Sequence, residues 1–186
     1  MDYNPRMELD QYTTEQVRHA LQVSAEIDAK ICEDDEIRSY WFLEEWKFGI
    51  DLALYQNGMG DEFFVLFSDN GTVIKGFDSA SELSPYENEN GNIWPGIYDG
   101  MPEDLLNLLD DENLKRSEVT FCFWRQAGGS HWQQGPVLLE NDEYDGSEIL
   151  LDQIFFTAEA YIDWAKDYYE QDFKKISLEE IRTRFT

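Results

Sequence analysis

The stretch EFFVLFSDNGTVIKGF, residues 62–77, decides the fold class of this chain. Residues 62–67 form an almost continuous apolar run of strand length, and residues 72–77 form a second run. The intervening SDNG, residues 68–71, ends in Asn-Gly, a pair that tolerates the positive φ values of tight hairpin turns. The stretch therefore predicts two antiparallel strands in the middle of the chain.

Further strand patterns lie on both sides of this hairpin. In residues 48–55 apolar side chains alternate with others, as they do in a strand. Residues 118–126, EVTFCFWRQ, predict another strand, and PVLLE at residues 136–140 is a possible pairing strand. The stretch that begins at Ile37 is ambiguous, because its first half is also compatible with a short helix.

Helical spacing replaces this alternation toward both ends of the chain. Residues 13–32 open with TTEQ, in which Thr13 and Gln16 have the spacing of a capping box. From Ser147 onward, apolar residues again recur at helical intervals. Residues 101–114 predict one more helix between the strands, with acidic residues near its positive N-terminal end.

Strands in the middle and helices at the ends are typical of an α+β fold rather than of alternating βαβ units. We expect an antiparallel sheet of four or five strands in the middle of the chain, packed against N- and C-terminal helices. The sequence has no internal repeat and no long linker, so residues 1–186 are predicted to form a single domain. A hydrophobic content of 42% is ample for one core.

Charge is the most unusual property of the composition. Against 40 acidic residues stand 14 basic ones, giving a net charge of −26. Such a field repels nucleic acid and anionic lipid and speeds the capture of basic macromolecules. We therefore expect a basic protein partner, no nucleic acid and no membrane. No apolar stretch approaches 18 residues and the N-terminus has no signal-peptide pattern, so a cytoplasmic location is predicted.

The sequence contains no catalytic or cofactor motif, so no cofactor is predicted and an enzyme is the less favoured class. Cys32 and Cys122 form no CxxC pattern, and reduced thiols are the simplest interpretation, although a disulfide between them stays open. His19 or His131 could serve a cysteine nucleophile only if the fold brought them together. Acid pairs or a divalent ion also stay open, because residues 141–152 loosely resemble a calcium loop.

Residues 76–104 form the main candidate for a functional segment. They include aromatic residues, prolines and glycines, and they contain neither Lys nor Arg. Between Phe48 and Leu114 the single base Lys75 stands against fourteen acids. Apolar anchors among acids suit a basic protein surface, and a merely solvated acidic surface is the alternative. The predicted interaction residues are Asp78, Glu82, Glu87, Glu89, Trp94, Tyr98, Asp99, Glu103 and Asp104.

The chain resembles a family of small, acidic, uncharacterised bacterial proteins, some of which are encoded as immunity partners of polymorphic toxins. The resemblance is carried by KGFDSASELSPY (75–86), WPGIYDGMPE (94–103) and TFCFWR…HWQQG (within 120–135), and it spans about residues 65–170. It rests on an arrangement of Gly, Pro and Trp and assigns no residue a role. It implies a cytosolic protein that neutralises a toxin, often a basic nuclease, by covering its active site.

Three hypotheses follow from these observations. The first is a non-enzymatic, immunity-type inhibitor of a basic protein such as a toxin. The second is a nucleic-acid-mimicking decoy that binds many basic proteins, and the third is a carboxylate- or metal-dependent hydrolase. For Trp94 the sequence leaves two roles open, an anchor in an interface or a pin for its own loop.

Overall fold

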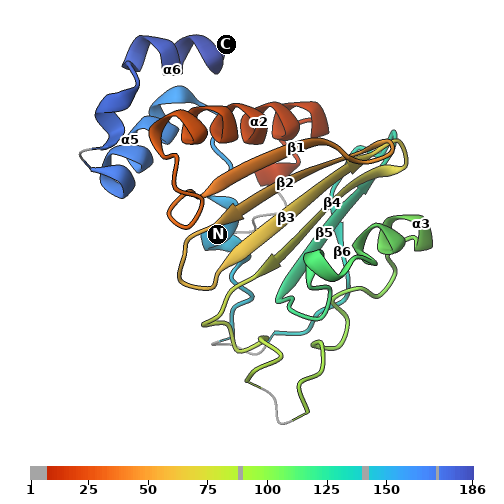
Figure 1. The fold of residues 1–186 in the computed structure, drawn as a ribbon. Helices are drawn as coiled ribbons and strands as arrows, with labels where there is room; N and C mark the ends of the chain where they lie inside the picture. The colour runs from red at the N-terminus through yellow and green to blue at the C-terminus, as the bar shows by residue number, and fades with distance from the viewer. Residues whose placement is uncertain (1–7, 88–89, 140–142, 171) are drawn as a thin grey trace.

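A computed structural model describes residues 8–87, 90–139, 143–170 and 172–186. Within this part of the chain, six strands form one open antiparallel sheet in which neighbours in sequence are neighbours in space (Figure 1). Helices from both ends of the chain pack on the sheet, which confirms the α+β class. The strands are β1 (Tyr40–Lys47), β2 (Ile50–Gln56), β3 (Glu62–Ser68), β4 (Gly71–Phe77), β5 (Phe121–Gln126) and β6 (Gln133–Gln134).

The sheet has more strands in the described chain than the four or five predicted, because the ambiguous stretch from Ile37 contains β1. In β1, Tyr40 and Phe42 pack toward one face of the sheet, while Trp41 on the other face is half-buried. Both faces of β1 are therefore apolar, and no alternation marks it as a strand. The last strand differs too, since the short β6 precedes residues 136–139, which lie outside any strand.

The β3–β4 hairpin has its turn where the sequence predicts it. Ser68 pairs with Gly71 across the two residues Asp69 and Asn70. Within this turn the positive φ falls on Gly71, at +144°, and not on Asn70. A Cβ atom at Gly71 would lie 2.3 Å from the carbonyl oxygen of Arg125 on β5. Glycine is thus required both by its own φ and by the close approach of the next strand.

We call the side of the sheet that packs against the helices the helical face. Phe63, Val65 and Phe67 of β3 point to this face and are buried there. The capping box of α2 is confirmed, because Thr13 and Gln16 exchange both side-chain-to-backbone hydrogen bonds. The helices are α2 (Thr14–Ile31), α4 (Ser147–Leu151), α5 (Ala158–Tyr169), α6 (Leu178–Arg184) and the 3₁₀ turn η3 (Asp172–Lys175).

A buried carboxylate joins the helices to the sheet on the helical face. Asp28 of α2 has no exposed surface. Its oxygens accept hydrogen bonds from the backbone N–H groups of Ser39 and Tyr40, both at 2.9 Å. They also accept the hydroxyls of Tyr161 (2.9 Å) and Tyr169 (2.7 Å) on α5. One side chain therefore ties α2, β1 and α5 together.

We call the opposite side of the sheet the covered face, because residues 93–119, which we call the cover, pack against it. Phe64, Leu66 and Trp124 form its core with Leu105 and Leu109 of the cover. The cover contains little regular structure, and its elements are the short α3 (Glu103–Leu106) and the 3₁₀ turns η1 (Asn107–Leu109) and η2 (Glu112–Leu114).

The helix predicted over residues 101–114 is wrong as a continuous element. The backbone leaves helical geometry at Asp110, where ψ is +52°. The side chain of Asp111 then accepts a hydrogen bond from the N–H of Asn113 and begins the separate turn η2. Aspartate competes in this way with helical hydrogen bonding, so the acidic run interrupts the leucine pattern.

The two cysteines lie on opposite faces of the sheet. Cys32 is buried in the core of the helical face and Cys122 in the core of the covered face, and both are free thiols. The disulfide left open by the sequence is therefore not formed. Among the helices of the described chain, none combines the length and apolar character that crossing a bilayer requires.

Candidate functional site

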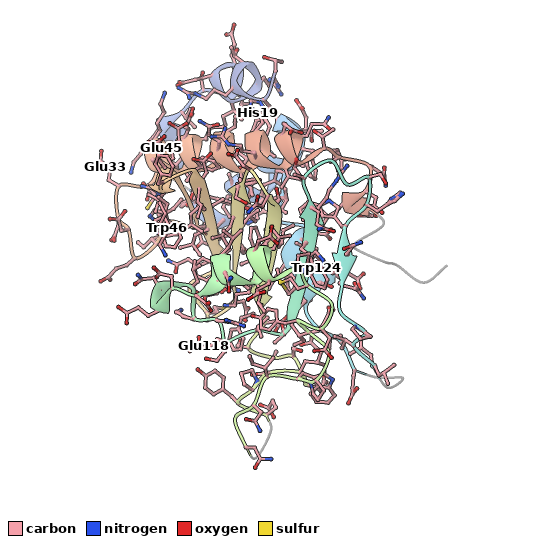
Figure 2. All side chains as sticks on the ribbon, turned by 90° about the vertical axis from the view of Figure 1, so that its right-hand side faces the viewer. His19, Glu33, Glu45, Trp46, Glu118 and Trp124 are labelled. Carbon is pink, nitrogen blue, oxygen red and sulfur yellow. The ribbon has the colours of Figure 1, made fainter. Side chains whose placement is uncertain are left out.

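Residues 76–104 are called the acidic segment from here on. Most of this segment lies at one end of the sheet, which we call the loop end. Its yellow-green part, which follows β4, projects below the sheet in Figure 1. In Figure 2, His19 of α2 lies on the helical side of the sheet, and Glu118 lies on the other side, toward the loops. The loop end consists of residues 57–61, 78–101, 135–139 and 143–147.

Hydrogen bonds connect these loops to one another. The N–H and hydroxyl of Ser79 donate to Asp61 Oδ1 at 2.8 and 2.6 Å, which joins the β2–β3 turn to the acidic segment. The Ser81 hydroxyl donates to the carbonyl oxygen of Tyr144 at 2.7 Å, which joins the segment to residues 143–147. These bonds therefore join three of the four parts of the loop end into one surface.

Asp78 belongs to the interior of this assembly. Only 6% of the residue is exposed, and its Oδ1 accepts the N–H of Ala80 at 2.8 Å. Its own N–H donates to the hydroxyl of Thr120 (3.1 Å), which in turn donates to the carbonyl of Asp145 (2.6 Å). Burial raises the pKa of the Asp78 carboxyl. Asp78 holds loops together and offers a partner almost no surface.

The other predicted acids divide between two places. Three of them are exposed at the loop end, namely Glu82, Glu87 and Asp99. Glu103 and Asp104 are exposed in the first turn of α3, which lies over the covered face. Glu89 lies outside the described residues. Within the described chain, none of these five exposed acids takes part in an ion pair.

Trp94 and Tyr98 are half-buried and pack against the core of the covered face. The Tyr98 hydroxyl donates to the carbonyl of Arg116 at 2.8 Å, and burial raises the pKa of Tyr98. Between them, a Cβ at Gly96 would lie 2.9 Å from the carbonyl oxygen of Pro136, so two loop backbones touch there. Trp94 therefore pins its loop and still exposes part of its indole.

Exposed apolar side chains at the loop end were not among the predicted residues. Tyr86 is 69% exposed, and its hydroxyl donates to Glu118 at 2.7 Å. Met59 is 79% exposed and Leu138 is 85% exposed, and Tyr144 is partly exposed as well. For Met59, Tyr86 and Tyr144 the sequence signal is a large apolar residue isolated among turn-forming residues, outside any strand or helix period. Leu138 lies in the run PVLLE, which the sequence offered as a possible strand, and so carried no such signal.

Basic side chains near this surface are already engaged. Lys115 Nζ lies 3.0 Å from Glu62, and Arg116 pairs with Asp110. On the helical side, several acids and bases form ion pairs between helices, while other exposed acids, such as Asp167 and Glu179, form none within the described chain. Those pairs include Lys30 with Glu180, Arg182 with Glu159 (2.9 Å) and Arg184 with Glu26 (2.5 Å).

The geometry gives little support to nucleophilic or metal chemistry. Burial raises the pKa of the Cys122 thiol, whereas a nucleophilic cysteine needs a lowered value. His131 lies 3.2 Å from Asp10, on the exposed surface. Asp145 Oδ1 accepts the N–H and hydroxyl of Ser147 at 2.9 and 2.6 Å, so a capped turn accounts for the described part of the calcium-like spacing. No cluster of metal-ligand side chains occurs in the residues that the structure describes.

Comparisons with known proteins do not assign the chain to a family. No family model, no curated protein and no solved structure matches it.

Proposed function

We propose that this chain is a non-enzymatic binding protein that captures a basic protein through its loop end. The observation that carries the proposal is the presence of exposed acids without ion pairs and exposed apolar side chains on one assembled surface. Glu82 shows the combination most directly, because its Oε2 accepts the backbone N–H of the partly exposed Tyr144 at 3.4 Å.

Physical reasoning assigns different tasks to the two kinds of side chain. Unpaired carboxylates and the overall charge of −26 accelerate the encounter with a basic surface. Exposed Tyr86, Leu138 and Met59 provide apolar area that keeps the complex together once it has formed. A second copy of this chain is disfavoured as the partner, since it would bring the same negative charge.

The partner class follows from the resemblance described above. We infer that the partner is a basic toxin and that the protein acts in the cytoplasm as its immunity-type inhibitor. A decoy that mimics nucleic acid is the second candidate, favoured by the size of the net charge alone. It differs from the first in binding many basic proteins with similar strength.

A charge-reversal experiment separates these functions. The loop-end variant Glu82→Lys, Glu87→Lys, Asp99→Lys is compared with the control Glu33→Lys, Asp167→Lys, Glu179→Lys, which changes the same number of exposed charges elsewhere. Each protein is used to capture partners from a lysate of the native host, and association rates are measured with the purified main partner. We expect one dominant basic protein, bound at least tenfold more slowly by the loop-end variant and normally by the control.

Other outcomes have defined meanings. Equal losses for both triple variants, with many captured proteins, would indicate the decoy. Normal association by the loop-end variant would contradict the proposed surface.

Apolar anchoring is tested by Trp94→Ala and Leu138→Ala. Both substitutions should increase the dissociation rate several-fold and leave association nearly unchanged, because apolar anchors act after the encounter. Only Trp94→Ala should also lower the free energy of unfolding, since Leu138 is 85% exposed. Unchanged dissociation for both variants would remove the apolar part of the proposal.

A further inference from the structure

A lysine is buried in the middle of the covered face. Lys75 of β4 has no exposed surface. Its cross-strand neighbours are Phe64 on β3 and Cys122 on β5, and its Nζ lies 5.0 Å from the centroid of the Phe64 ring. The amine donates a hydrogen bond to the carbonyl oxygen of Leu114 at 3.0 Å. The base that stands alone among the acids of the sequence therefore lies inside the protein, beneath the cover.

Leu114 is the first residue of a short turn, residues 114–118, which we call the anchor turn. Lys115 has a left-handed backbone with φ +46°, and its Nζ bonds both oxygens of Glu62 on β3 at 3.0 and 3.1 Å. The left-handed conformation is unfavourable for a residue that has a side chain, so contacts must hold Lys115 in place. Lys75 and Glu62 thus attach the anchor turn to the sheet.

The anchor turn in turn receives the acidic segment. The hydroxyl of Tyr98 donates to the carbonyl of Arg116 at 2.8 Å. The hydroxyl of Tyr86 donates to Glu118 Oε1 at 2.7 Å. Figure 2 labels Glu118 on the side of the sheet away from the helices, where the loops project. A chain of hydrogen bonds thus runs from the sheet through the anchor turn to the loop end.

We propose that Lys75 is the positioning residue of the loop end: its buried amine holds the anchor turn, which holds Tyr86 and Tyr98. The biological role of this attachment rests on the proposed function, whereas the attachment itself needs no partner. It predicts that the cover and the acidic segment detach from the sheet as one unit when the attachment at Lys75 is lost.

Several charged or titratable groups face Lys75. They are Glu62 from β3, Lys115 and Glu118 from the anchor turn, and Cys122 from β5. The described chain gives Lys75 no hydrogen bond to a carboxylate, and its acceptor is an uncharged carbonyl. Burial lowers the pKa of Lys75 to about 8, and the two glutamates only partly oppose this effect.

The attachment therefore depends on protons, with a definite sign. In a detached state the amine is in water and regains an ordinary pKa near 10.5. Protonation consequently favours the detached state, and detachment becomes rarer as the pH rises above about 8, by up to tenfold per pH unit. A neutral amine still donates to Leu114, so the hydrogen bond survives this change.

Hydrogen exchange followed by mass spectrometry tests the attachment at pH 7. Lys75→Met removes the donor and leaves the Leu114 carbonyl buried without a partner. We expect exchange at least tenfold faster in peptides covering residues 82–101 and 103–118, with α2 and β3 unchanged. Ile74→Val is the control, because Ile74 is the adjacent buried residue of β4 and points to the helical face. Its exchange should not rise selectively in the cover.

A lysine ¹³Cε titration provides a second test that holds even if Lys75→Met does not fold. One resonance should titrate near pH 8, and amide shifts of the anchor turn should follow the same midpoint. A Lys75 resonance that titrates with the exposed lysines, or exchange in the cover of folded Lys75→Met within twofold of the wild type, would overturn the inference. Failure to bind any basic partner, with both tests positive, would reject the proposed function and leave the positioning role intact.

Discussion

Each face of the sheet buries a charged side chain, but the two faces differ in the number of hydrogen bonds that hold it. On the helical face, Asp28 accepts four hydrogen bonds, two from backbone N–H groups and two from tyrosine hydroxyls. On the covered face, Lys75 makes its bond to a single carbonyl. A buried group held by hydrogen bonds from several elements fixes those elements, whereas one held by a single bond leaves its surroundings easier to open. We therefore infer that the helical face is the scaffold and that the covered face carries the part that opens more easily.

The difference extends to secondary structure. Regular helices cover one face, and some of their exposed charges form ion pairs, as Arg182 does with Glu159 at 2.9 Å, while Asp167 and Glu179 form none within the described chain. An irregular segment covers the other face, and its exposed acids Glu82, Glu87 and Asp99 form no ion pair within the described chain. At the loop end, acids without ion pairs therefore coincide with irregular structure and exposed apolar side chains. This is the surface expected to meet a partner.

The largest expected effect comes from breaking the network of the helical face. Asp28→Ala removes the acceptor of four donors and leaves them buried, so the free energy of unfolding should fall by about 3–5 kcal/mol. Chemical denaturation measures the change. Tyr169→Phe, which removes one donor only, should cost about 1 kcal/mol. A loss for Asp28→Ala no larger than that for Tyr169→Phe would remove the distinction between the faces.

An intermediate effect is expected from pH on the covered face. Because the pKa of Lys75 is about 8 in the folded protein and near 10.5 when unfolded, its buried charge costs stability below pH 8. This cost disappears as the pH rises from 8 to 10.5, so stability should increase by on the order of 3 kcal/mol over that window.

Other groups act in the opposite direction at high pH. Burial raises the pKa of Cys122 and of Tyr40, so ionisation of these groups in the unfolded chain lowers stability above about pH 9. The measurement is therefore the difference between the wild type and Lys75→Met, by denaturation at each pH. A difference that stays constant from pH 7 to 10 would contradict the prediction.

The smallest expected effect concerns the surface of the helical face. Lys30→Met removes an exposed ion pair with Glu180, and such pairs contribute about 0–1 kcal/mol. The thermal midpoint should shift by no more than a few degrees, and added salt should reduce the shift. A larger loss would mean that ion pairs between helices, and not the Asp28 network, hold the helical face together.

The sequence was sufficient for the parts of the fold that have a clear period. The β3–β4 hairpin, the cap of α2 and the general α+β arrangement all follow from local patterns. Strand β1 does not, because Trp41 and Phe42 make both of its faces apolar. The cover, residues 93–119, has a helical period only within residues 101–114, so the sequence alone could not indicate which face of the sheet it occupies.

The candidate site was predictable as a segment but not as a surface. The sequence identified the acids, yet only folding separates the buried Asp78 from the exposed Glu82. Two signals were present for the buried charges. Asp28 lies on the apolar stripe of its helix, seven residues after Leu21, and Lys75 lies two residues after Val73 on the same face of β4. A charged residue at a core position is the pattern that would have found both.

The placement of the two free thiols makes each face separately observable. Cys32 and Cys122 are almost completely buried on opposite sides of the sheet, so a thiol reagent can modify either one only after the layer above it has moved away. The alkylation rates of Cys32 and Cys122 in the native protein would thus report separately on the opening of each face. If the covered face opens on its own, Cys122 will become labelled while Cys32 remains protected.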